Sequence, residues 1–445
     1  MAGDSATLTV TLTALAGCLG WGIRGVFGHQ AGAMVPGALM GGAVALTCLP
    51  RDGVAPPHAV LLLMAVGAAG ISVGGVMTYG QTLGLVHGER RPTTYWWGLL
   101  GCFVKGGLWF ALGAVLLGLA LAGELGRPLD VLRLAFWALL FAQAGRRLLN
   151  RPLRPPFLYP VVYFSRRVAE HEDISLGPPR QESWGGLLGA LLAICVFSWL
   201  TLGAPQVWPA AAVGFLAGGL GFSVGEALQA WGIWRKPFGP LAQPWLDWWK
   251  VMEMAFGLIA GAGLGLAMLL VRPAAQWLDP WPGGYGPLAA VIGMAWLALV
   301  VGNAWGNRTA SRLNDMPLLS AGLLLTATSA APRLAPALVV GGFLLYISGA
   351  DVLKRLRGQV SAAGLTATHV ALALLAVGGA AMVAVVLPPE AVLVSVALSQ
   401  TILAFAKALV EAGPGPLGGR LRRLRAAIGV ETSFVVLTAL LWALS

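Results

Sequence analysis

The sequence predicts an all-α protein that crosses a membrane many times. Hydrophobic residues make up 57% of the 445 residues and charged residues only 11%, and the mean hydropathy is +0.77. Soluble domains carry about a quarter of charged residues, so this composition excludes a soluble globule. Backbone hydrogen bonds in lipid must be made within each segment, so the spans are expected to be α-helices. The 62 glycines are typical of closely packed membrane helices.

Apolar runs of roughly 17 to 25 residues predict about 14 spans, within a range of about 12 to 14. The first eight are expected at 6–23, 31–50, 58–80, 97–122, 131–148, 185–203, 207–230 and 251–271. The others are expected at 286–306, 316–331, 334–350, 366–387, 391–410 and 428–444. The short runs 316–331 and 334–350 are either two half-helices or one span with a re-entrant piece.

Basic residues concentrate in alternate loops, which predicts the orientation of the chain. Lysine and arginine accumulate in cytoplasmic loops. The loops after odd-numbered spans hold most of them, including Arg90, Arg91, Arg146, Arg147, Arg151, Arg154, Arg235, Lys236, Arg308, Lys354, Arg355, Arg420, Arg422 and Arg423. Both termini are therefore expected outside the cytoplasm, in a bacterial inner membrane. The first apolar stretch follows Asp4 and no basic residue, so it is expected to be a span and not a cleaved signal peptide.

A hairpin with polar residues at matching positions recurs along the chain. Thr78, Gly80 and Gln81 match Ser223, Gly225 and Glu226 at a constant offset. The polar positions of the three copies are Gln81, Glu226 and Gln400 in the first span, and Lys105, Glu253 and Glu431 in the second. Copies separated by an even number of spans form parallel repeats. The expected division is repeat unit 1 at 1–122, a connecting span at 123–149, a cytoplasmic connector at 150–184, repeat unit 2 at 185–271, and repeat unit 3 with an extra helical pair at 272–445.

These intramembrane charges are the first candidate site. A charge at the centre of a membrane helix costs roughly 2.5 to 3.5 kcal/mol on insertion scales, so such residues usually have a function. Glu226 is expected deepest and, with Glu253 or Glu431, is predicted to bind H⁺ or Na⁺, with Lys105 as their partner. The alternative is that the charges lie within a turn or two of the interface and extend to water.

A glycine-rich passage after the first span is the second candidate. Gly20 to His29 contains Arg24, and an unwound backbone there would present N–H groups to an anion. The alternative is a cytoplasmic turn with one arginine. The motif Trp21-Gly22-Ile23-Arg24 resembles Trp305-Gly306-Asn307-Arg308, so Asn303 and Arg308 are expected on an equivalent wall.

Other patterns predict no chemistry. The four cysteines lack CxxC spacing, so no metal and no cofactor are expected. Two strings of the form G-x-S-x-G, at 70–74 and 221–225, lie within spans and are read as helix-packing segments, because a nucleophile elbow needs a strand before the serine. The connector near 150–183 is expected to rest its basic half on anionic headgroups, or to act as a gate or docking segment.

Together these features favour a transporter or channel-like permease for a small polar or anionic solute, coupled to H⁺ or Na⁺. Its expected surroundings are the lipid bilayer and its solute, without nucleic acid. The alternative is a membrane-embedded transferase for a lipid-linked or phosphorylated substrate, with Arg24 and Arg308 on the phosphate and Glu226 or His29 as general base. A non-catalytic subunit of a larger complex is a third class.

Overall fold

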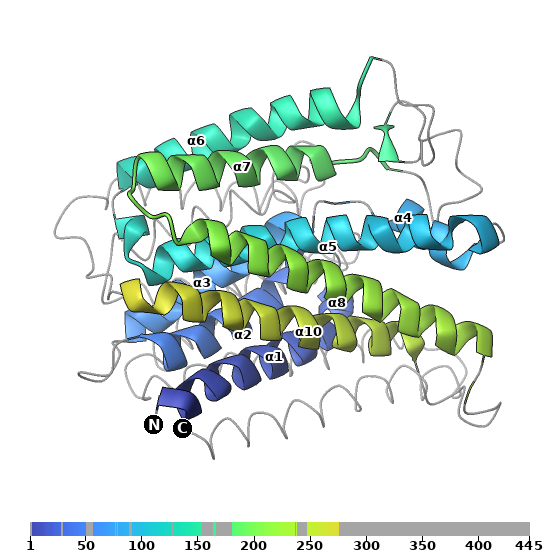
Figure 1. The fold of residues 1–445 in the computed structure, drawn as a ribbon, viewed down its shortest axis with the longest axis horizontal. Helices are drawn as coiled ribbons and strands as arrows, with labels where there is room; N and C mark the ends of the chain where they lie inside the picture. The colour runs from blue at the N-terminus through green and yellow to red at the C-terminus, as the bar shows by residue number, and fades with distance from the viewer. Residues whose placement is uncertain are drawn as a thin grey trace, which may run out of the picture. The chain divides into compact units, whose positions relative to one another are not determined.

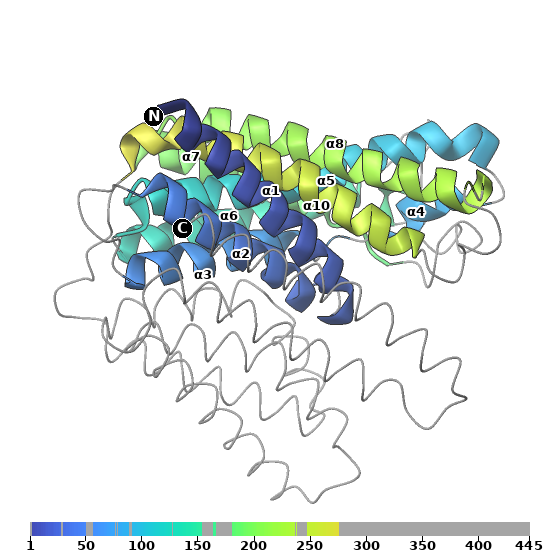
Figure 2. The same ribbon diagram turned by 90° about the horizontal axis from the view of Figure 1, so that it is seen from below.

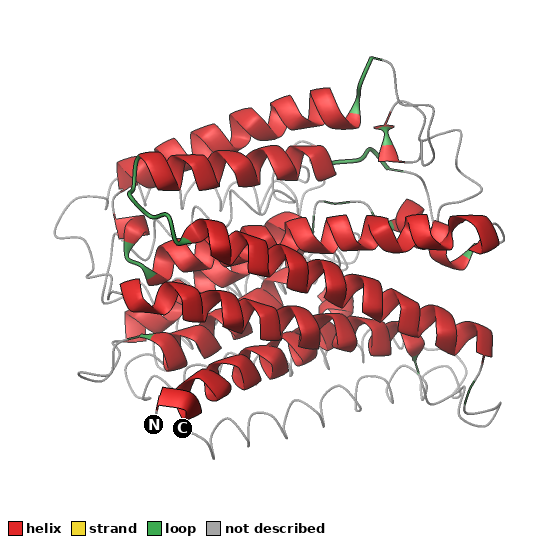
Figure 3. Cartoon of the chain, in the orientation of Figure 1, coloured by secondary structure: helices red, strands yellow, loops and turns green. Residues whose placement is uncertain are grey.

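The fold is taken from a computed structural model, which describes residues 2–27, 30–49, 57–75, 77, 79–88, 91–126, 128–153, 163–165, 180–235, 237 and 247–275. All regular elements within these ranges are helices (Figure 3). The chain divides into two compact units, one of Met1–Gly22 with Gly74–Ala274 and one of Ile23–Val73 with Ala275–Ser445. Each unit is considered by itself.

The first unit contains most of the described helices (Figure 1). They are α1 (Ala2–Phe27, as far as Gly22), α4 (Gly80–His87), α5 (Arg91–Leu121), α6 (Pro128–Gly145), α7 (Trp184–Leu200), α8 (Val207–Arg235) and α10 (Trp248–Val271). A π-helical turn, η2, extends α6 over Arg146–Asn150. The 3₁₀ turns η1 and η5 cover Glu124–Gly126 and Arg272–Ala274. The described part of the second unit holds α2 (Gln30–Cys48) and α3 (Pro57–Gly74).

Four of the described helices are long and apolar enough to cross a membrane. They are Ser5–Gly22, Thr93–Leu121, Val207–Arg235 and Trp248–Ala274, and Gly32–Cys48 and Trp184–Leu200 are shorter apolar helices. The prediction of an all-α fold is confirmed for the described residues, and these four helices are candidate membrane spans. A helix lies at each expected span up to residue 275, and the remaining spans lie outside the described residues.

The third expected span differs from the prediction. We expected one helix over 58–80, but α3 ends at Gly74 and the separate short helix α4 begins at Gly80. Gln81 therefore lies in the first turn of α4, whereas Glu226 lies well inside the continuous α8. The two matched segments thus have different local structures, which does not support the repeat in the described residues. The third copy, around Gln400 and Glu431, lies outside them.

The core of the first unit is built from α1, α5, α8 and α10, with glycines at the helix crossings. A Cβ on Gly17 of α1 would collide with the backbone of Gly257 in α10, and the reverse also holds. Gly106 of α5 and Gly218 of α8 make the same reciprocal contact. Side-chain-free crossings let backbones approach closely where lipid supplies no hydrophobic drive to associate.

The contacts along these crossings fix the helix directions. Moving up α1 from Thr13 to Gly17 moves the contact down α10 from Gly261 to Gly257, so these two helices are antiparallel. The same reasoning makes α8 antiparallel to α5 and to α10. Figures 1 and 2 both show α8 and α10 side by side. The end of α8 and the beginnings of α5 and α10 therefore lie on one side of the bundle.

An aromatic cluster fills the centre of this bundle. The ring of Trp21 lies 4.5 Å from that of Phe256 and 4.9 Å from that of Trp109, between centroids. Phe222 stacks on Phe256 at 5.0 Å. Such contacts stabilise helix packing beyond the area buried. The tryptophan of the Trp21-Gly22-Ile23-Arg24 motif is thus a core residue.

The glycine crossing predicts a sharp dependence on side-chain size. Replacing Gly218 with Leu should force α8 away from α5 and lower the thermal stability of the purified chain in detergent, because the new side chain meets backbone. The matched control is Ala212→Leu, which adds the same side chain to an exposed position of α8. Equal stability of the two variants would contradict the crossing.

Candidate functional site

Of the side chains that the structure describes in the helices of the first unit, three charged ones are buried. The exposed fraction is 1% for Lys105 in α5, 0% for Glu226 in α8 and 1% for Glu253 in α10. Lys105 lies near the middle of α5, Glu226 in the last third of α8 and Glu253 in the second turn of α10. The expectation that Glu226 lies deepest in the membrane stays a prediction. None of the three faces lipid, so each needs a polar partner inside the protein.

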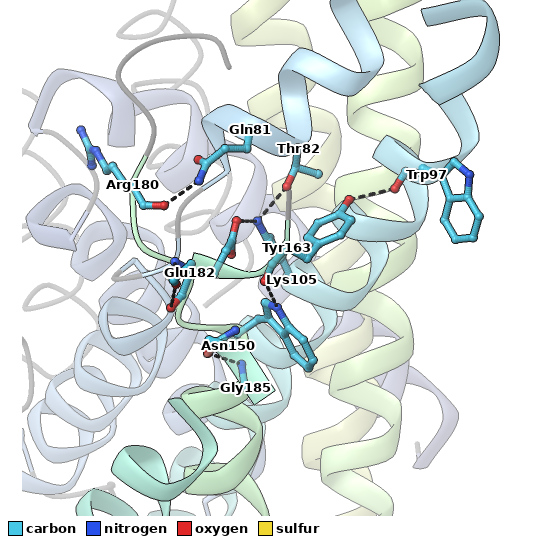
Figure 4. Close-up of polar contacts among 11 residues, drawn as sticks. Gln81, Thr82, Trp97, Lys105, Asn150, Tyr163, Arg180, Glu182 and Gly185 are labelled. Carbon is cyan, nitrogen blue, oxygen red and sulfur yellow. Dashed lines mark hydrogen bonds and ion pairs between the residues drawn. The ribbon is translucent and has the colours of Figure 1, made fainter. Parts of the chain in front are cut away.

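Lys105 is held by a carboxylate from the connector before α7. Its Nζ donates to Oε1 of Glu182 at 3.0 Å and to Oγ1 of Thr82 in α4 at 2.7 Å (Figure 4). It also lies 5.2 Å from the ring centroid of Tyr163, within the range of a cation–π contact. Lys105 and Glu182 are both fully buried, so the ion pair is shielded from water.

Further hydrogen bonds hold the connector against the helices. Nε2 of Gln81 donates to the carbonyl of Arg180 at 2.6 Å, and the hydroxyl of Tyr163 donates to the carbonyl of Trp97 at 2.9 Å. The backbone N–H of Glu182 donates to Oγ of Ser165 at 2.8 Å. Burial raises the pKa of Tyr163 well above its usual range, which keeps its hydroxyl protonated as a donor.

The start of α7 is joined to the end of the η2 turn. The backbone N–H of Gly185 donates to Oδ1 of Asn150 at 3.0 Å, which satisfies one of the free N–H groups at the beginning of α7. Arg151 also donates to the side chain of Gln181. Because Asn150 and Gly185 are hydrogen-bonded, the two ends of the connector lie side by side. This contact helps to position Glu182, three residues before Gly185.

Glu226 has a different partner, His87 at the end of α4. Nε2 of His87 lies 2.9 Å from Oε2 of Glu226, and the side chains are 8% and 0% exposed. The ring of His87 lies 6.4 Å from that of Trp234, between centroids. A histidine is the one partner whose charge changes near neutral pH.

Glu253 completes the group with a partner on its own helix. Nζ of Lys250 donates to Oε2 of Glu253 at 2.5 Å, and Nε1 of Trp249 donates to Oε1 at 3.2 Å. Lys250 is thus the counter-ion of Glu253. Glu226 and Glu253 are close enough for their charges to repel.

These pairings correct one expectation. We expected Lys105 to face Glu253, but Lys105 binds Glu182 and Glu253 binds Lys250. The partners had been sought on neighbouring spans and not on the connector. Arg180 and Tyr163 of the connector contact α4 and α5, while most of its basic half, expected on headgroups, lies outside the described residues.

The second candidate site is only partly described. The glycine-rich passage is helical through Phe27 and not unwound, and Arg24 is buried in the last turns of α1. A Cβ on Gly32 of α2 would collide with the carbonyl oxygen of Arg24, so this turn packs tightly. His29, Asn303, Arg308, Gln400 and Glu431 lie outside the described residues.

The two serine strings are packing segments, as their sequence context indicates. Ser223 lies in α8 and donates to the carbonyl of Leu99 in α5 at 2.9 Å, while Ser72 in α3 donates to the carbonyl of Ala69 at 3.0 Å. Both hydroxyls therefore satisfy helix backbone groups. Among the described residues, no group of three or more His, Cys, Asp or Glu is placed to hold a metal ion.

No family model, curated protein or solved structure matches this chain. The site itself is then the basis for a proposal of function.

Sequence reasoning missed His87 and Glu182. His87 comes shortly before Arg90 and Arg91 in the sequence, so it was interpreted as part of an ordinary basic loop. Glu182 stands two residues before α7, and its closeness to an apolar helix was the available signal. A lysine buried in a helix bundle needs an opposite charge beside it, and this carboxylate supplies that charge.

The pairing of Lys105 predicts a specific energetic coupling. Removing either partner with Lys105→Met or Glu182→Gln should destabilise the chain by about 3 to 5 kcal/mol, because the remaining charge is buried alone. The double variant should lose clearly less than the two single losses combined. Thermal unfolding in detergent measures this. As a control, Lys105→Met combined with Glu253→Gln should be additive, and coupling to Glu253 instead of Glu182 would contradict the pairing.

Proposed function

We propose that the chain is a multi-pass transporter or channel-like permease for a small polar or anionic solute, driven by H⁺ or Na⁺. The observation that carries the proposal is the complete burial of Glu226 beside His87 inside a bundle of membrane-type helices. A carboxylate kept in such a place costs free energy that a purely structural helix avoids. A side chain that binds and releases an ion gives a reason for it.

The arrangement around Glu226 supports coupling between an ion and an anionic solute. Lys105, Glu226 and Glu253 come from three adjacent helices of one unit, and each is neutralised by a different group. Lys105 binds the carboxylate of Glu182 beside Thr82. Many small anionic solutes carry the same carboxylate group. Gln81 contacts the same connector segment, because its side chain donates to the carbonyl of Arg180.

The proposed transporter keeps the finer features that the sequence predicts. We propose that it has about 14 spans, that both termini lie outside the cytoplasm and that it lies in a bacterial inner membrane. Ion binding is assigned to Glu226, with Glu253 as its neighbour and Glu431 as a further carboxylate.

Glu226→Gln tests the proposal. The full chain in liposomes containing a pH-reporting dye is exposed to a panel of small carboxylates, phosphate and neutral polar solutes, under H⁺ and Na⁺ gradients. We expect uptake of at least one anionic solute by the wild type and a fall to the level of empty liposomes in Glu226→Gln, because the amide carries no ionisable charge.

The matched control is Asp247→Asn, an exposed cap of α10 that Asn also fills. It should transport as the wild type does. Full activity of Glu226→Gln at normal membrane expression would refute the role of Glu226.

A further inference from the structure

We infer that Glu226 and His87 form a proton-binding pair, which makes H⁺ and not Na⁺ the coupling ion. The inference rests on the proposed function for its link to transport. Proton binding itself is a property of the purified chain and can be measured without a solute.

The first argument is the chemistry of the pair. His87 Nε2 and Glu226 Oε2 are 2.9 Å apart and both side chains are almost fully buried. With one proton between them the pair is neutral overall, whichever group holds it, and with none it carries one negative charge. An apolar interior disfavours the net charge, so proton loss and proton gain change the stability of this packing. The Lys105–Glu182 pair differs, because its positive and negative charges already cancel each other.

Further polar atoms of the same helices are left unpaired among the described residues. Within that part of the chain, Oε1 of Glu226, Nδ1 of His87 and Oε1 of Gln229 are buried without a hydrogen-bond partner. Gln229 follows Glu226 by three residues on α8, so the two side chains share a helix face. The two carbonyl-type oxygens are both acceptors, and a proton on Oε1 of Glu226 would turn that oxygen into a donor. A buried polar group without a partner calls for an explanation, and proton binding supplies one.

The third argument is that the other groups around Glu226 do not compete for this role. From α5, Tyr95 and Cys102 interact with its charge, and both are ordinarily neutral at pH 7. From α10, Glu253 faces it but is paired with Lys250. The sequence of α7 contains no acidic, basic or histidine residue. Among the described residues, His87 is thus the partner of Glu226 that we propose to share a proton with it.

The described side chains near Glu226 favour a proton over a metal cation. Hard cations are bound by several oxygen atoms. Among the described residues, the buried side-chain oxygens without a hydrogen bond on this part of α8 are Oε1 of Glu226 and Oε1 of Gln229, and the partner of Glu226 is an imidazole ring.

Infrared difference spectroscopy of the full chain in lipid nanodiscs tests the inference. Stepping the pH should produce the carbonyl band of a protonated carboxyl group in the wild type. The band should be lost in Glu226→Gln and kept in Asp247→Asn. In His87→Gln it should persist to more alkaline pH, because the carboxyl group no longer shares its proton with an imidazole. Addition of NaCl in place of KCl should leave the titration unchanged.

A second measurement does not depend on any variant folding. In wild-type chain with isotope-labelled histidine, nitrogen NMR should show one imidazole that titrates with the same midpoint as the carboxyl band, since coupled groups share their titration steps. A band that survives in Glu226→Gln, or one that Na⁺ abolishes, would overturn the inference. A titrating band without any solute uptake would leave the proton site standing and remove the transporter proposal, whereas Na⁺-driven uptake without a band would do the reverse.

Discussion

The cost of burying charge in an apolar bundle is the constraint on which this structure depends. Lys105, Glu226 and Glu253 sit on three packed helices, and each has found a partner within hydrogen-bond distance. The partner of Lys105 lies in the connector, that of Glu226 in the short helix α4, and that of Glu253 in α10 itself. The folding of the connector and of α4 is thus tied to the charges, since breaking a buried pair leaves a charge that the interior cannot solvate.

The three pairs differ in what they can do. The Lys105–Glu182 ion pair fastens the connector to α4 and α5, with Thr82 and Tyr163 beside it. Lys250–Glu253 neutralises a carboxylate that would otherwise repel Glu226. Of these three pairs, Glu226–His87 is the one that we propose to become negatively charged when it releases a proton. Two fixed pairs around one titratable pair is an arrangement suited to ion coupling.

The sequence predicted the helices well and their partners poorly. Long apolar runs are a local signal, so α1, α5, α8 and α10 appear where expected. The break between Gly74 and Gly80 escaped notice because the sequence there stays apolar and glycine-rich on both sides. Glu226 and Lys105 were singled out from hydropathy alone, but His87 and Glu182 depend on how α4 and the connector return to the bundle. That return is set by tertiary contacts such as Asn150 with Gly185, which no periodicity encodes.

The central claim is that the buried charges are neutralised in the pairs given above. An electron cryo-microscopy structure of the full chain in a lipid nanodisc at near-neutral pH tests it most directly. We expect density joining Glu226 to His87 and Lys105 to Glu182, with all four side chains away from lipid. A map in which Lys105 contacts Glu253, or in which Glu226 faces the bilayer, would contradict the account.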